Sequence, residues 1–94
     1  MKTYVASKEK KAFGICNYER IDESVLFAKV VKLISSEHGV SILDRKTEPT
    51  EDIVNGTLDG VSFSVIFDSG YDLTEILCDN DQIREKLRRI VENG

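Results

Sequence analysis

The sequence contains few of the residues that most often carry catalysis or bind metal ions. Its single histidine, His38, would have to serve any Ser-His-Asp or Cys-His arrangement alone, and neither cysteine is placed near it in the sequence. The two cysteines, Cys16 and Cys78, are widely separated and have no CxxC motif or neighbouring histidine. This spacing indicates neither a zinc site nor a redox pair. We therefore expect buried, reduced thiols, with no metal ion and no cofactor.

Long apolar runs and phosphate-binding glycine motifs are also missing. A membrane-spanning helix needs about 18 consecutive apolar residues, and no segment approaches that length. Residues 8–11 are all charged, which interrupts the N-terminal segment before the apolar part of a signal peptide could form. We expect a cytoplasmic protein with no membrane partner. The six glycines are scattered singly, without a GxGxxG or GxxxxGK[ST] motif, which disfavours nucleotide-binding enzymes.

The composition is that of a folded globular protein. Hydrophobic residues make up 40% of the 94 residues and charged residues 32%. This length suits one domain, spanning residues 1–94, near the lower end of the range in which one core is stable without metals or disulfides. The sequence has no internal repeat that would indicate a larger architecture.

Charge is distributed unevenly along the chain, whose net charge is -4. Residues 44–82 carry ten acidic side chains against only two basic ones, whereas residues 1–20 and 83–94 are both net basic. The middle segment therefore predicts an acidic surface. Nucleic acid binding depends on clustered lysines and arginines and is disfavoured, although the sequence leaves open whether the two basic ends meet in space.

The first predicted helix begins after Asp22, a residue type that commonly caps helix N-termini. Apolar residues then cover most of the helix circumference, so we expect a heavily buried helix. Gly39 is placed as its C-cap, which puts His38 in the last helical turn.

The second predicted helix lies near the C-terminus. Asp79 can cap it, with Gln82 as the partner of a capping box. Glu85 and Arg89 form a favourable i, i+4 pair on the solvent-facing side of this helix. One face carries an apolar stripe made of Ile83, Leu87, Ile90 and Val91.

The strongest local signal is Asp59-Gly60, the pair preferred at the centre of a type I′ turn, between apolar runs at 53–58 and 61–67. We expect a β-hairpin there. Further strands are predicted at residues 3–6, 12–17, 40–43 and 73–78, and residues 44–52 are predicted to form one long loop. The order ββ-α-ββββ-α predicts an α+β two-layer sandwich: a mostly antiparallel sheet of about five or six strands with two helices packed on it.

Some acidic motifs weakly resemble metal-binding patterns. Asp44-Arg45-Lys46 has the D-x-K form of metal-dependent nucleases, so an enzyme using Asp44 and Lys46 is one alternative. Asp79-Asn80-Asp81 begins like a calcium loop but lacks the required glycine and leads into a helix, which favours a capping role. The aspartates on either side of Gly70 are typical of a tight turn.

These features favour a non-catalytic binding protein over an enzyme. Carboxylates in loops attract a basic protein partner and orient it. Small acidic α+β proteins without catalytic groups include bacterial immunity proteins and inhibitors, which makes neutralising a basic toxin or enzyme the most concrete role. The predicted contact residues are Glu48, Glu51, Asp52, Asp68, Tyr71 and Asp72, with the tyrosine as an interface anchor.

Two other interpretations remain open at this point. The free edge of a short open sheet can pair with a second copy of the chain, which would make the protein a homodimer with a structural role. Acidic loops also keep small domains soluble without binding any partner.

Overall fold

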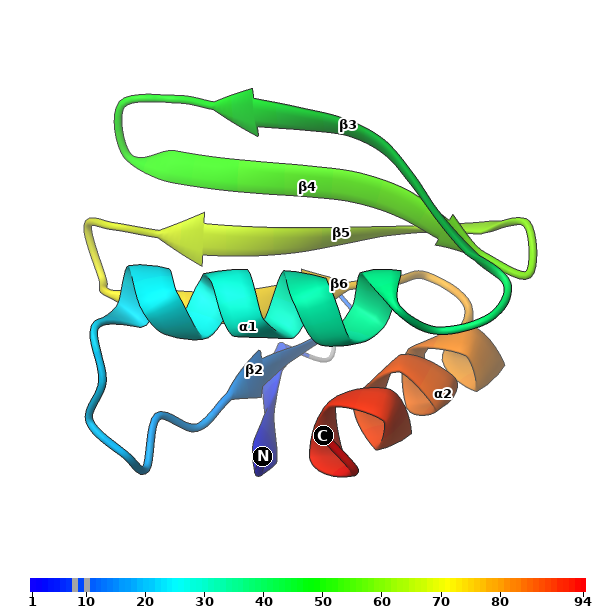
Figure 1. The fold of residues 1–94 in the computed structure, drawn as a ribbon, viewed down its shortest axis with the longest axis horizontal. Coiled ribbons are helices and arrows are strands. Elements are labelled where there is room, and N and C mark those ends of the chain that lie inside the picture. The colour runs from blue at the N-terminus through cyan, green and yellow to red at the C-terminus, as the bar shows by residue number, and fades with distance from the viewer. Residues whose placement is uncertain (8, 10) are drawn as a thin grey trace.

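The helices and strands follow the order expected from the sequence, ββ-α-ββββ-α. The structure is a computed structural model that describes residues 1–7, 9 and 11–94. The expected two-layer α+β arrangement is confirmed (Figure 1). The elements are β1 (Thr3–Ser7), β2 (Ala12–Ile15), α1 (Glu23–Ser35), β3 (Val40–Thr47), β4 (Glu51–Leu58), β5 (Val61–Asp68), β6 (Leu73–Leu77) and α2 (Asp81–Glu92).

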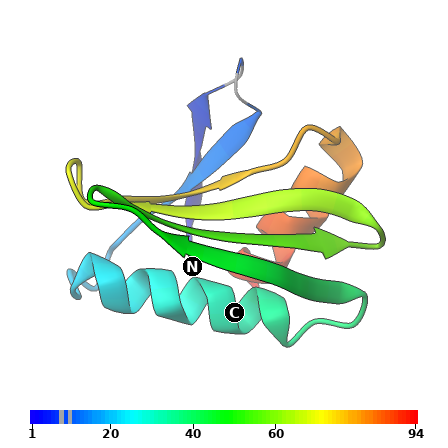
Figure 2. The same cartoon turned by 90° about the horizontal axis from the view of Figure 1, so that it is seen from above.

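One six-stranded antiparallel sheet contains all the strands in the order β1-β2-β6-β5-β4-β3. Helix α1 carries the chain from β2 to the far edge of the sheet, and the strands from β3 to β6 then return toward β2 (Figure 1). Side chains from both helices join one hydrophobic core on one face of the sheet. Seen from above, α1 lies on one side of the sheet and the β1–β2 hairpin rises on the other (Figure 2).

The predicted Asp59-Gly60 hairpin is confirmed, and its turn has the geometry of type I′. Both central residues have positive φ angles, 52° for Asp59 and 82° for Gly60. The turn pairs Leu58 with Val61, and the pairing continues without a bulge to Glu51 and Asp68 at the other end. Alternation along the two strands places Val54, Leu58, Phe63 and Val65 in the core.

Helix α1 begins as predicted but differs in burial and in its end. The Asp22 carboxylate accepts a hydrogen bond from the Ser24 amide at 3.0 Å, which confirms the cap. Only one face is buried, and Val25 is 47% exposed, so the expectation of a heavily buried helix is wrong. The reason is that the sheet covers one side of the helix while the other side faces solvent.

The predicted C-terminus of α1 is also wrong. The helix ends at Ser35, and both Ser35 and Ser36 donate their hydroxyl hydrogens to the Lys32 carbonyl. Serine hydroxyls compete in this way with the backbone for helical carbonyls, which favours an early end. His38 therefore lies exposed beyond the helix, and Gly39, with φ of 87°, turns the chain toward β3.

Helix α2 is capped by Asn80 and not by Asp79. The Asn80 side chain accepts a hydrogen bond from the Ile83 amide at 2.9 Å. The Cys78 amide still donates to the Lys11 carbonyl, which keeps the chain in the sheet past β6 and delays the helix by one residue. The predicted Glu85–Arg89 pair is present, with Arg89 Nε 3.7 Å from Glu85 Oε1.

The predicted long loop at residues 44–52 is wrong, because most of this segment is strand. Strand β3 continues to Thr47 and β4 begins at Glu51, which leaves residues 48–50 as the connection. The backbone of this segment pairs with β4 in register, and the Asn55 amide donates to the Asp44 carboxylate at 2.8 Å. An edge strand tolerates a polar sequence because most of its side chains remain in solvent.

Both cysteines are free thiols, as expected, but they differ in burial. Cys78 is buried and Cys16 is half-buried, so the prediction of burial holds fully only for Cys78. Burial raises the pKa of the Cys78 thiol. The Cys78 amide bonds to the residue just before β2, whereas Cys16 follows the end of that strand. This separation excludes a disulfide without backbone movement.

None of the helices among the described residues has the length and apolar character needed to span a bilayer.

Replacing Thr74 by valine is expected to stabilise the protein. The Thr74 hydroxyl is fully buried and finds no hydrogen-bond partner among the described residues, so its desolvation is uncompensated. Valine keeps the shape without the hydroxyl, and the free energy of unfolding should increase by about 1 kcal/mol. Urea denaturation measures this change. Thr74→Ser is the control: it keeps the hydroxyl, loses a buried methyl group and should be destabilising. A Thr74→Val variant less stable than wild type would contradict this explanation.

Stability is expected to fall at acidic pH through the ion pairs of α2. Hydrogen bonds from Arg88 lower the pKa of Glu85, and those from Arg84 lower the pKa of Asp81. A carboxylate whose pKa is lower in the folded state stabilises the fold above its unfolded pKa, which is about 4, and this contribution is lost as the pH falls through the folded value. Urea midpoints should therefore decrease below about pH 4, and less so in Glu85→Gln. Equal losses in the two proteins would refute the role of Glu85.

Candidate protein-binding surface

Two turns meet at one end of the sheet, where β3 passes into β4 and β5 passes into β6 (Figure 1). Both the amide and the hydroxyl of Ser69 donate to the Thr50 carbonyl, at 2.9 and 3.1 Å. Residues 48–50 and 69–72 therefore form one hydrogen-bonded unit, although they are far apart in the sequence.

The six predicted contact residues lie on these turns and on the strand ends beside them. Glu48, Tyr71 and Asp72 are exposed in the turns, and Glu51, Asp52 and Asp68 are half-buried at the ends of β4 and β5. Asp52 differs from the others because it is paired with Phe67, on the side of the sheet that carries α1. We call this surface the acidic end, and it comprises Glu48, Glu51, Asp52, Asp68, Tyr71 and Asp72.

Asp68 shapes the turn that presents Tyr71. One Asp68 carboxylate oxygen accepts hydrogen bonds from the Gly70 and Tyr71 amides, at 2.9 and 3.1 Å. Such a bond from an aspartate to the backbone two residues ahead stabilises a tight turn. Asp72 has a φ of 55°, a left-handed conformation that aspartate tolerates better than most residues. Tyr71 is 82% exposed, so the turn holds a large aromatic ring in solvent.

Like charges are placed directly opposite each other at the acidic end. Glu51 and Asp68 are register partners on adjacent antiparallel strands, and neither forms an ion pair among the residues that the structure describes. Opposed like charges destabilise a pair of strands. We therefore expect this opposition to disfavour the free protein, and a cationic group bound beside the two carboxylates would reduce the repulsion.

The cations of α2, in contrast, are paired with acids. Arg88 contacts both Glu85 and Glu92, and Arg84 Nη2 lies 2.7 Å from Asp81 Oδ1. Lys86 Nζ lies 2.7 Å from Asp59 Oδ2, at the end of the sheet opposite the acidic end. Positive charge in the helix is therefore largely balanced locally, whereas the carboxylates of the acidic end form no ion pair among the described residues.

Parts of the two basic terminal segments do lie near each other. Lys11 lines a surface depression together with Arg84 and Arg88, but two acids of α2 line it as well. The predicted basic residues Lys8 and Lys10 lie outside the described part of the chain.

Asp44 and Lys46, the two functional positions of the D-x-K motif, share one face of the sheet, and Arg45 between them lies on the other. Asp44 is opposite Asn55 and Lys46 is opposite Ile53, on the face away from the helices, whereas the Arg45 guanidinium lies 5.5 Å from the centre of the Phe27 ring. In residues 1–7, 9 and 11–94, no group of three potential metal-ligating side chains is found. The nuclease interpretation stays a prediction, because the described residues place no third potential ligand with this pair.

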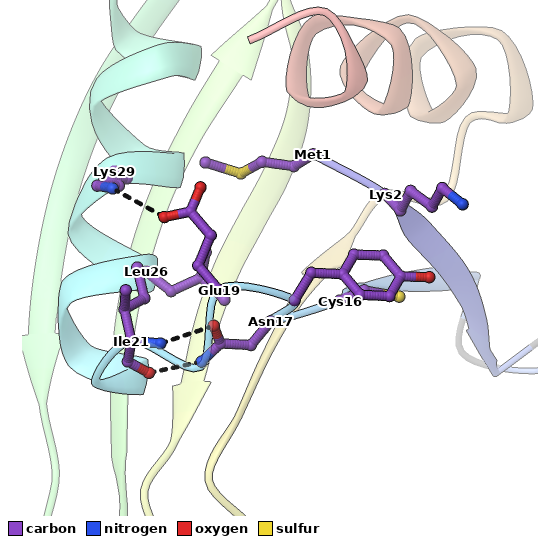
Figure 3. Close-up of a pocket in the computed structure, with 9 residues that line it drawn as sticks. Met1, Lys2, Cys16, Asn17, Glu19, Ile21, Leu26 and Lys29 are labelled. Atoms are coloured by element: carbon purple, nitrogen blue, oxygen red, sulfur yellow. Dashed lines mark hydrogen bonds and ion pairs between the residues drawn. The ribbon is translucent and has the colours of Figure 1, made fainter.

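A small pocket lies between the N-terminal segment and α1 (Figure 3). Its volume is about 80 Å³, well below the range of about 300–1,000 Å³ typical of small-molecule sites. Asn17 bridges the backbone of Ile21 in this region and also donates to the buried Glu23 carboxylate at 2.9 Å. These hydrogen bonds hold the start of α1 in place, so the residues around the pocket have a structural role.

Comparison with known proteins does not place the chain in a protein family. No family model, no curated protein and no solved structure matches it. The acidic end is therefore interpreted from its own residues and their geometry.

Sequence reasoning missed three features of this surface. It placed Glu51 in a long loop and did not predict its pairing with Asp68, which follows from counting residues outward from the Asp59-Gly60 turn. The hydrogen bonds between Ser69 and Thr50 have no local sequence signal. The apolar residues Ile53 and Ile66, which face each other on the face away from the helices, were assigned no role.

Replacing Glu51 by glutamine is expected to stabilise the fold. The change removes one of two opposed carboxylates and keeps the shape of the side chain, so the free energy of unfolding should increase by about 0.2–1 kcal/mol at low salt. Differential scanning calorimetry at low and high salt measures the effect, which screening should reduce. Glu75→Gln is the matched control, because Glu75 is also half-buried on the same face of the sheet and its register partners, Ile66 and Gly14, carry no charge. Equal effects of the two substitutions would contradict a specific repulsion.

Proposed function

We propose that the protein is a non-catalytic binding protein that recognises a basic region of another protein through its acidic end. The observation that carries this proposal is the opposed pair Glu51 and Asp68, which forms no ion pair with the described residues although the cations of α2 are paired. Sites that violate a local rule of stability are expected where function demands it. A basic partner supplies the missing countercharge.

The geometry of the turns supports this role in a second way. Tyrosine in an exposed and well-defined position is a common anchor of protein interfaces, and Tyr71 is held in such a position by the Asp68 hydrogen bonds. The surrounding carboxylates accelerate association with a basic surface and select its orientation. The most concrete form of the proposal is an immunity or inhibitor protein that neutralises a basic toxin or enzyme.

Dimerisation through a strand edge has less support. The free edges of the sheet are β1 and β3, and the register of each shifts once, between Val5 and Ser7 in β1 and between Ile42 and Asp44 in β3. Such irregularities reduce the ability of an edge to accept another strand.

Charge substitution at the acidic end is expected to abolish partner binding. We suggest the double variant Glu48→Lys/Asp72→Asn, because both side chains are exposed and Asn tolerates the left-handed conformation of Asp72. The control is Glu19→Gln/Glu37→Lys, which changes the net charge equally at exposed positions outside the acidic end. The immobilised full-length chain is exposed to an extract of its own cells, and bound proteins are quantified by mass spectrometry.

The wild type and the control variant should capture the same basic proteins, and the acidic-end variant should lose them. Raising the salt concentration from about 50 to about 500 mM should release them, because exposed charges are screened. Capture of the same proteins by all three forms, or capture that is indifferent to salt, would refute the proposal.

A further inference from the structure

The face of the sheet away from α1 and α2 has an apolar centre. On this face Ile53 is opposite Ile66, and Ile66 is opposite Glu75, whose neighbours two residues away on β6 are Leu73 and Leu77. We call these four residues, Ile53, Ile66, Leu73 and Leu77, the open-face patch. Each is half-buried, and the core that α1 and α2 share lies on the other face. The β1–β2 hairpin rises on the side of the patch (Figure 2).

Acidic residues lie within and beside the open-face patch, with Glu75 between Leu73 and Leu77 on β6. Strand alternation places Asp44, Glu51, Asp68 and Glu75 on the same face, whereas Lys46 is the one basic residue among the strand residues there. None of the four acids forms an ion pair among the described residues. Because Glu51 and Asp68 also belong to the acidic end, the patch and the acidic end form one continuous surface.

This face is hollowed beside the patch. Leu43, Asn55, Ser64 and Leu77 are among the residues that line an open depression of about 420 Å³. Ser64 donates to Asn55 at 2.6 Å, and Asn55 donates to Asp44, so the polar side chains of the floor bond to one another. A partner can therefore cover this floor without leaving all of these polar groups unpaired.

We propose that the open-face patch binds an amphipathic helix of the protein partner, with lysine and arginine along both borders of the helix's apolar stripe. This inference rests on the proposed function, which it deepens by naming the recognised element. Apolar residues of such a helix cover the patch, and its cations meet the acids within and beside the patch. A helix of about 18 residues is about 27 Å long and matches the 30 × 28 × 25 Å dimensions of the molecule.

Synthetic peptides test the proposal directly. The probe is a fluorescein-labelled amphipathic peptide of about 18 leucine and lysine residues, and fluorescence anisotropy reports its affinity for the full-length chain. A leucine–glutamate peptide of the same pattern tests the charge, and an oligolysine of equal charge tests the apolar stripe. The leucine–lysine peptide should bind at least about tenfold more tightly than either.

Two substitutions on the open face should weaken binding of the leucine–lysine peptide. Ile66→Lys places a charge in the patch and should reduce affinity about tenfold or more. Glu75→Gln removes one of the acidic charges on this face without altering shape and should reduce affinity about threefold, which remains informative if Ile66→Lys does not fold. Val25→Lys is the matched control, because Val25 is an exposed apolar residue on α1, and it should leave affinity unchanged.

The outcomes separate this inference from the proposed function. If Glu48→Lys/Asp72→Asn weakens binding while Ile66→Lys and Glu75→Gln do not, the helix site is refuted and the acidic end stands. If the leucine–glutamate peptide binds equally well, both proposals fail. A wild-type dimer in sedimentation that Ile66→Lys dissociates would assign the patch to a second copy of the chain and overturn the inference.

Discussion

The register of the β4–β5 hairpin is the constraint on which the proposed surface depends. The Asp59-Gly60 turn pairs Leu58 with Val61, and this pairing sets every opposition along the two strands. A slip by one residue would move each side chain to the other face of the sheet. Leu58 and Val65 lie in the core because of this register, and Glu51 faces Asp68 at the far end for the same reason.

The two ends of the hairpin consequently have different electrostatic roles. Near the turn, the Asp59 carboxylate pairs with Lys86 and so joins α2 to the hairpin, and the Asp59 amide donates to the Gly39 carbonyl just before β3. At the far end, the carboxylates of Glu51 and Asp68 form no ion pair among the described residues. The cations of α2 therefore have acidic partners, whereas the acids at the opposite end have no cationic partner among the described residues. We interpret that imbalance as the basis of partner recognition.

The sequence predicted those parts of the structure that depend on local chemistry. The type I′ turn follows from Asp59-Gly60, and the start of α1 follows from the Asp22 cap, because a few neighbouring residues determine each. Strand β3 was underestimated because its last residues are polar and are stabilised by pairing with β4, which the local sequence does not reveal. The cap of α2 was misplaced by one residue because Asp79 and Asn80 are both suitable caps.

The candidate site was predictable in composition but not in arrangement. Acidic residues in the middle of the chain indicated an acidic surface. Five of the six predicted contact residues lie together at the turns and the adjacent strand ends, and the sixth, Asp52, lies on the side of the sheet that carries α1. Their assembly depends on the bonds between Ser69 and Thr50 and on the sheet register, which are properties of the tertiary structure. Their role in partner binding remains a prediction.

Hydrogen–deuterium exchange of the full-length chain, alone and bound to the protein that it captures, tests the central claim most directly. Exchange reports local protection of backbone amides along the sequence. The account predicts slower exchange at residues 48–52 and 68–72 in the complex, with little change in α2. Protection confined to α2 or to the β1–β2 hairpin would contradict it.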